Sequence, residues 1–154
     1  MDSSPNVRMV DVGEKAITAR QAVARGRVVM VASTFKALKE GNLPKGDALA
    51  AARLAGIMAA KETHRLIPMC HPLLIEEITV DFSLDEGANA VEITAMAKGS
   101  GKTGFEMEAM TALTVSALTI YDMCKAVDPA LRLENIRLIE KSGGKSGRVV
   151  LEER

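Results

Sequence analysis

The sequence is poor in aromatic residues and in cysteine. It has no tryptophan, one tyrosine and three phenylalanines among 154 residues, which predicts one compact domain with an aliphatic core rich in methionine and alanine. Cys70 and Cys124 lie far apart, and neither belongs to a CxxC pair. We therefore expect two free thiols and neither a disulfide nor a structural zinc site.

The sequence also lacks an excess of charge and a long apolar run. Twenty basic residues balance twenty acidic ones, which argues against nucleic acid and membranes as partners. The N-terminus has no basic start followed by an apolar run, and no segment approaches the ~20 apolar residues of a membrane span. We expect a cytoplasmic protein in which local cations hold any anionic ligand.

Hydrophobic periodicity and turn residues predict an α+β fold. We expect a disordered lead over residues 1–8 and one domain over residues 9–154. The expected strands cover 9–12, 28–31, 74–84, 91–98, 133–141 and 148–151, and the expected helices cover 34–40 (capped by Ser33), 48–66 (capped by Asp47) and 103–127. Residues 16–24 fit either an extended segment or a helical turn, and Gly26 favours the extended one. Their order is the split βαβ pattern of a ferredoxin-like fold, an antiparallel sheet with helices packed on one face.

The helix expected over 103–127 separates its charges. Glu106 and Glu108 lie in its first turns, residues 109–121 carry no charge, and Asp122 and Lys125 lie in its last turn. Asp122 and Lys125 share one helical face, so they form either a simple surface ion pair or a lysine held beside a carboxylate for proton transfer.

Three other segments are candidate sites. Residues 100–103, Ser-Gly-Lys-Thr, resemble the end of a nucleotide-binding P-loop, but Met96 stands where that motif needs glycine, so a glycine turn is the better interpretation. His64, Cys70 and His71 make a weak metal site, although the flanking prolines suit the presentation of His71 to a ligand. Residues 141–147, with Lys141, Lys145 and three glycines, form either a flexible turn or a phosphate-binding loop.

Seven ordered motifs resemble the MoaC family of cyclic pyranopterin monophosphate synthases. They are MVDV at 9–12, KGD at 45–47, AARLAGIMAAK at 51–61, LIPMCHPL at 66–73, GKTGFEMEAM at 101–110, ALTIYDMCKAV at 117–127 and KSGGKSG at 141–147. The resemblance implies conversion of (8S)-3′,8-cyclo-7,8-dihydroguanosine 5′-triphosphate to cyclic pyranopterin monophosphate with release of pyrophosphate, a step of molybdenum cofactor biosynthesis. It also implies a homohexamer assembled as a trimer of dimers.

The resemblance further implies which residues act. Asp122 matches the catalytic aspartate of the family and Lys125 its essential lysine. The positions that match substrate-contacting or other active-site positions are Met69, Cys70, His71, Glu106, Met107, Glu108, Lys45, Lys141 and Arg20. The chemistry is a series of proton transfers without a redox step, so we expect no cofactor and no metal. We expect Lys125 to be the general acid and base, with a pKa lowered by burial and by neighbouring lysines.

Physical reasoning adds two expectations. A triphosphate needs several cations, which Arg20, Lys45, Lys141 and Lys145 supply, and a guanine-derived N–H edge suits the carboxylate of Glu108. At 1.5 Å per residue, Glu108 and Asp122 stand roughly 21 Å apart, so we expect two subunits to complete each site.

Two other functions remain open at this point. A non-catalytic nucleotide- or metabolite-binding effector module would bind the nucleotide without releasing pyrophosphate. A metal hydrolase built on His64, Cys70 and His71 would be sensitive to chelators.

Overall fold

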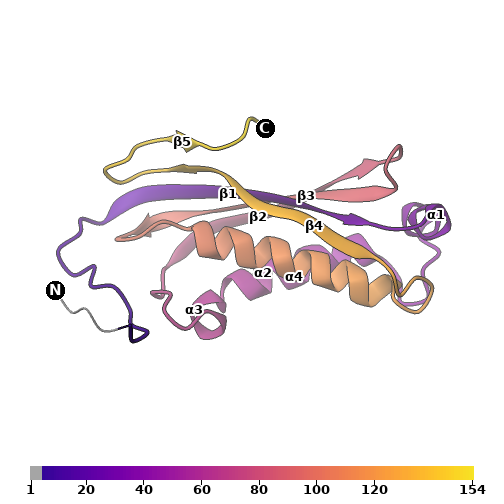
Figure 1. Ribbon diagram of the computed structural model, residues 1–154, viewed down its shortest axis with the longest axis horizontal. Helices are drawn as coiled ribbons and strands as arrows, with labels where there is room; N and C mark the ends of the chain where they lie inside the picture. The colour runs from indigo at the N-terminus through magenta and orange to yellow at the C-terminus, as the bar shows by residue number, and fades with distance from the viewer. Residues whose placement is uncertain (1–4) are drawn as a thin grey trace.

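A computed structural model describes residues 5–154 of the chain (Figure 1). Its elements are β1 Thr18–Val29, α1 Ala32–Glu40, α2 Ala48–Ala60, α3 Thr63–Leu66, β2 Ile75–Asp85, β3 Ala90–Gly101, α4 Glu106–Cys124, β4 Arg132–Ser142 and β5 Val149–Val150. Of the lead expected to be disordered, residues 1–4 lie outside the described residues, and residues 5–8 are exposed and belong to no helix or strand.

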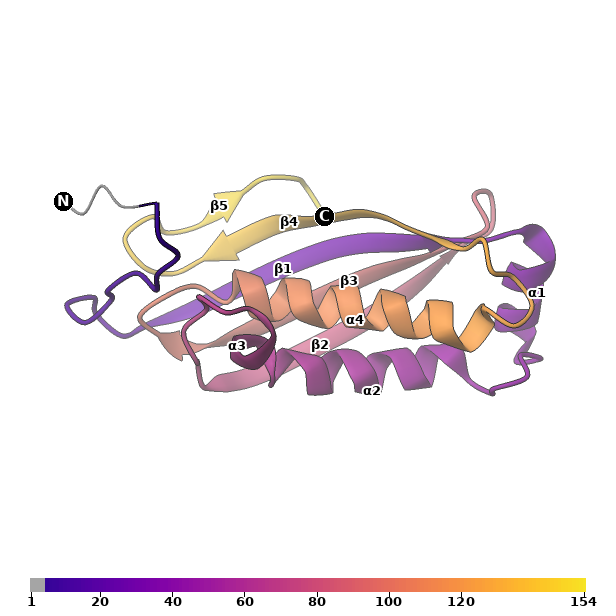
Figure 2. The same cartoon turned by 60° about the horizontal axis from the view of Figure 1, so that its bottom comes forward.

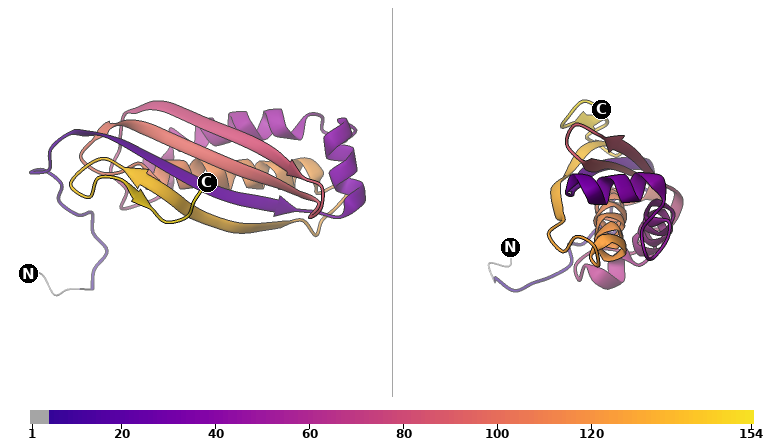
Figure 3. Two further views of the ribbon diagram at one scale, coloured as in Figure 1. Left: turned by 90° about the horizontal axis from the view of Figure 1, so that it is seen from above. Right: turned by 90° about the vertical axis from the view of Figure 1, so that its right-hand side faces the viewer.

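The strands form one sheet in the order β2-β3-β1-β4-β5, and every neighbouring pair is antiparallel. Helices α2 and α4 lie side by side against one face of this sheet, as the end-on view in Figure 3 and the tilted view in Figure 2 show. This arrangement confirms the α+β, ferredoxin-like fold that the order of elements predicts. The expected hairpin of β2 and β3 is also confirmed.

The strand expected over residues 9–12 is wrong. These residues are largely exposed and join no strand, and a turn follows them in which the Lys15 amide donates to the Val12 carbonyl at 3.0 Å. β1, the strand nearest in sequence, pairs with β3 on one side and β4 on the other. It therefore offers no free edge to an additional strand.

Three helix boundaries also differ from the sequence prediction. α1 begins at Ala32 with Val31 as its N-cap in place of Ser33, and the Val31 amide donates to Asp128 Oδ2, 97 residues away. The helix expected over 48–66 is divided, because the Thr63 hydroxyl donates to the Ala60 carbonyl at 2.7 Å where α2 ends. β3 continues as far as Gly101, and α4 begins at Glu106 instead of at the expected residue 103.

Helices α2 and α4 approach each other closely at Gly56. A Cβ atom on Gly56 would lie 2.1 Å from Ser116 Oγ and 2.7 Å from the Ala112 carbonyl oxygen. The Ser116 hydroxyl is fully buried and donates to the Ala52 carbonyl at 2.9 Å. The small residues of α2 therefore allow α4 to pack in direct contact with α2 beneath the sheet. No helix within residues 5–154 is long and apolar enough to cross a membrane.

A Gly56→Ala substitution should destabilise the protein despite the better helix propensity of alanine. We expect a loss of about 1–3 kcal/mol in the free energy of unfolding, because the added methyl group must displace the backbone of α4. Urea denaturation of this variant, of Ser116→Ala and of the double variant measures the coupling between the two positions. The double variant should recover only part of the loss, because the Ala112 carbonyl remains in the way. A Gly56→Ala variant as stable as the natural chain would contradict this close packing.

Candidate active site

A cavity of about 980 Å³ opens where α4 begins and β4 ends. Its volume lies within the range of sites for small molecules. Its walls come from the N-terminal segment, the start of β1, the Cys70–His71 loop, the turn before α4 and the loop after β4. The lining residues are Asp11, Glu14, Lys15, Ala16, Thr18, Arg20, Gln21, Cys70, His71, Thr103, Gly104, Glu106, Met107, Lys141, Ser142, Gly143, Gly144, Lys145 and Ser146.

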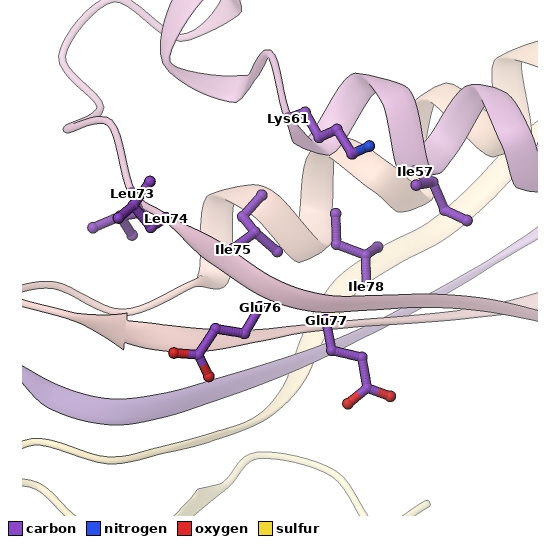
Figure 4. Close-up of a pocket in the computed structure, with 8 residues that line it drawn as sticks. All are labelled: Ile57, Lys61, Leu73, Leu74, Ile75, Glu76, Glu77 and Ile78. Carbon is purple, nitrogen blue, oxygen red and sulfur yellow. The ribbon is translucent and has the colours of Figure 1, made fainter.

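A second, smaller cavity of about 280 Å³ lies between α2 and the edge strand β2 (Figure 4). Its lining consists of leucine and isoleucine side chains with Lys61, Glu76 and Glu77. It contains none of the site residues predicted from the sequence. The larger cavity is therefore the candidate site.

Two basic side chains of the larger cavity are held in place by the chain itself. Arg20 in β1 donates from Nε to the Gly101 carbonyl at 2.9 Å and from Nη2 to the Lys102 carbonyl at 3.3 Å. Lys141 in β4 forms an ion pair with Glu106 at 3.1 Å. Guanidinium and ammonium groups fixed at one cavity can bind a polyphosphate without first being ordered.

Glu108 lies beside this cavity in a buried position. Its side chain is only 3% exposed, and its Oε1 accepts no hydrogen bond from the residues that the structure describes. Cys70 Sγ lies 3.8 Å from the other oxygen, Oε2. Burial raises the pKa of the Glu108 carboxyl to about 6, and burial together with the Glu108 charge raises the pKa of the Cys70 thiol to about 11. At neutral pH, a buried carboxylate thus faces a thiol that keeps its proton.

The stability of the protein should depend on pH through Glu108. Its pKa is raised on folding, so the neutral carboxyl favours the folded state below about pH 4.5, and this contribution is lost as the pH rises through about 6. The shift corresponds to about 2 kcal/mol. Urea denaturation at one protein concentration between pH 4 and 7 should show this loss in the natural chain relative to Glu108→Gln. Parallel pH profiles of the two proteins would contradict the shift.

A separate charged cluster lies at the far end of α4. Asp122 accepts from Lys125 at 2.8 Å through Oδ1 and from Lys45 at 3.1 Å through Oδ2. All three side chains are about half exposed. The contact with Lys125, and then that with Lys45, lowers the pKa of Asp122. The contact with Asp122 raises the pKa of Lys125, so the expectation of a lowered value is wrong in the single chain, where Lys125 is not buried.

The structure divides the predicted site residues between the two ends of α4. The seven that line the cavity are Arg20, Cys70, His71, Glu106, Met107, Lys141 and Lys145. Glu108 contacts Cys70 behind them, Met69 lies in the same loop without lining the cavity, and Lys45, Asp122 and Lys125 form the distant cluster. Glu108 and Asp122 therefore lie near opposite ends of one continuous helix, as expected.

The N-terminal segment contributes lining residues that the sequence analysis did not assign to the site. Asp11, Glu14 and Lys15 reach the cavity, and Lys102 Nζ donates to the Gly13 carbonyl at 3.1 Å. The MVDV motif at 9–12, one of the motifs that resemble the MoaC family, pointed to this segment, but we expected a short strand there.

The structure can be compared with two further expectations, the free thiols and the metal site of the metal-hydrolase alternative. Cys70 and Cys124 are both free thiols, as predicted. Within residues 5–154, no three side chains among histidine, cysteine, aspartate and glutamate are grouped so that they could hold a metal ion. His64, Cys70 and His71 therefore do not form the site that the metal-hydrolase alternative requires.

Comparison with known proteins identifies the family of the chain. A model of the MoaC family matches residues 9–144. A cyclic pyranopterin monophosphate synthase of Chloroflexus aurantiacus is 57% identical over 147 residues, which cover 96% of this chain and 90% of the relative. Those of Heliobacterium modesticaldum and Roseiflexus castenholzii are 56% and 54% identical over 152 residues, 99% of this chain and 96% of each relative. The chain belongs to the MoaC family.

Proposed function

We propose that this chain is a lyase-type cyclic pyranopterin monophosphate synthase of molybdenum cofactor biosynthesis. Its substrate is (8S)-3′,8-cyclo-7,8-dihydroguanosine 5′-triphosphate, and pyrophosphate leaves as the pterin product forms. The observation that carries this proposal is the cavity beside Glu108, which combines fixed cations with a buried carboxylate in a chain of the MoaC family. The names of the relatives support the same function.

The cavity suits the two halves of this substrate. Arg20, Lys141 and Lys145 are the cations that bind the triphosphate. Glu108 lies behind the lining residues, and its buried Oε1 has no donor among the described residues, so it is the acceptor for the N–H edge of the guanine-derived ring once the substrate displaces the Cys70 contact. Cys70, His71 and Met107 line the cavity, and Met69 precedes Cys70 and His71 in their loop.

Lys125 and Asp122 carry out the proton transfers in this proposal. Lys125 enters the reaction as an ammonium group, the form of lysine at neutral pH, and the contact with Asp122, which raises its pKa, must weaken before the proton is released. Asp122 orients it, and Lys45 holds the second oxygen of Asp122. Docking against a second subunit would bury this exposed cluster and strengthen its interactions with substrate.

The active site is completed by a second copy of the chain. Glu108 and Asp122 are 14 positions apart on one helix, roughly 21 Å at 1.5 Å per residue, so a single substrate molecule cannot contact both ends of one α4. The helices also leave large apolar side chains in solvent, with Leu54, Met58 and Leu118 more than half exposed. We propose a homo-oligomer with shared sites, a hexamer assembled as a trimer of dimers.

The test is incubation of the purified protein with freshly generated cyclic dihydro-GTP. Release of pyrophosphate together with formation of the pterin product is the expected result. Binding of the nucleotide without pyrophosphate release would overturn the proposal and would support a non-catalytic effector module instead. Glu62→Gln, which changes an exposed carboxylate of a surface ion pair with Arg65, is a matched control that should leave both products unchanged.

A further inference from the structure

We infer that the C-terminal segment 148–154 is a strap that positions Lys141 and the loop 142–147 at the cavity. The segment lies beyond residue 144, where the match to the family model ends. The inference rests on the proposed function only for the identity of the anion that the loop binds. Its structural basis is independent of that identity.

The strap is attached to the end of β4 by its backbone. β5 pairs Val150 with Glu140 and Val149 with Lys141, and the amides of Leu151 and Glu152 both donate to the Ile139 carbonyl, at 2.8 and 3.1 Å. Figures 1 and 2 show β5 and the chain end on the side of the sheet away from α2 and α4. The strap therefore adds hydrogen bonds to the strand that carries Lys141.

The strap also lies near a small apolar area on this outer face. Ile139 is fully buried and Val23 is 1% exposed, yet neither belongs to the core cluster between the sheet and the helices. Val23 alternates along β1 with the core residues Ala22 and Ala24, so it points to the opposite face. Val23 faces Glu140 across the β1–β4 ladder, and Val150 of the strap pairs with Glu140 on the other edge of β4.

Charged side chains fasten the strap at two points. Glu140, whose side chain is 11% exposed, accepts from Arg148 Nε at 2.8 Å and from Arg154 Nε at 3.0 Å. Arg137 donates two hydrogen bonds to Glu152, at 2.8 and 2.7 Å. Glu140 precedes Lys141 directly, so its two arginines fix the backbone from which the Lys141 side chain reaches Glu106.

The other side of the loop rests on Arg20. Gly143 and Gly144 have φ values of +98° and +72°, and a Cβ atom on Gly144 would lie 2.5 Å from Arg20 Nη1. Such a glycine-rich loop has many accessible conformations when one end is free. With the strap bound, the loop is held between Arg20 and β5, and its lysines stay at the cavity.

Two changes test the role of the strap. The Arg148→Gln/Arg154→Gln double variant removes its ion pairs with Glu140, and truncation after Gly147 removes the strap itself. Amide hydrogen exchange reports the order of residues 142–147, and calorimetric titration with inorganic tripolyphosphate reports anion affinity. The matched control is Lys39→Gln/Lys98→Gln, which also removes two cations, each paired with one carboxylate and neither lining the cavity. This control corrects for the loss of positive charge in the double variant, whereas the truncation removes two arginines and two glutamates and leaves the net charge unchanged.

We expect both strap variants to exchange the loop amides at least about tenfold faster, and to bind tripolyphosphate about fivefold more weakly than the control. If the truncated chain fails to fold, the double variant alone decides. Unchanged loop exchange, or an affinity equal to that of the control, would overturn the inference. Conversion of cyclic dihydro-GTP by the natural chain is assayed separately, so a failure of the proposed function is distinguished from a failure of the strap.

Discussion

A Lys125→Ala chain should convert cyclic dihydro-GTP at least about 100-fold more slowly than the natural chain and still bind it, because a positioned proton donor contributes on this scale. Lys125 is an ammonium group that contacts Asp122 at 2.8 Å, and this contact raises its pKa. The cations that we propose for the triphosphate, Arg20, Lys141 and Lys145, are intact in this variant, so affinity should change little. Single-turnover pyrophosphate release measures the rate, and calorimetry measures the affinity.

Lys125→Arg separates proton transfer from charge. Arginine keeps the positive charge but does not give up a proton near neutral pH, so this variant should stay slow if Lys125 donates a proton. Lys39→Ala, which removes an exposed lysine from an ion pair with Glu86, serves as the control and should keep the natural rate. A near-normal rate for Lys125→Ala would contradict the catalytic role.

Mixing two inactive variants should restore activity. Glu108→Gln and Lys125→Ala each damage one end of α4, and each is expected to be inactive alone. If one subunit supplies the Glu108 end and another the Lys125 end, random reassociation of equal amounts leaves about a quarter of the sites with both ends intact. Pyrophosphate release after joint unfolding and refolding measures the recovered fraction.

The same-end mixture is the matched control. Asp122→Asn and Lys125→Ala damage the same end of the helix, so no arrangement of these chains produces an intact site, and the mixture should stay inactive. Equal behaviour of the two mixtures would contradict a site shared between subunits. Recovery only in the Glu108 and Lys125 mixture would support both the oligomer and the division of roles along α4.

Features that depend on neighbouring residues could be predicted from the sequence. Asp47 caps α2, as expected, and Gly41 ends α1 in the left-handed conformation directly after the helix expected over 34–40, because capping involves residues within one turn. The β2–β3 hairpin and the charge-free middle of α4 follow from periodicity over short segments. Met96 excluded a P-loop because that motif is also local.

The candidate site could be predicted as a set of residues but only partly as an arrangement. Motif resemblance identified residues at both ends of α4, and helix geometry alone required their separation. It did not show that Lys45 reaches Asp122 across 77 positions, or that the N-terminal segment lines the cavity. These contacts depend on how distant elements pack.

The long helix shows where the sequence was sufficient and where it was not. The sequence by itself determined that α4 exists, that its middle is apolar and that its two ends carry different chemistry, because helical periodicity is a short-range property. Only the tertiary structure decided that Glu108 is buried with a raised pKa and that Lys45, 77 positions away, helps to lower the pKa of Asp122. A pKa depends on desolvation and on the charges that folding brings near, and these come from elements far away in the chain.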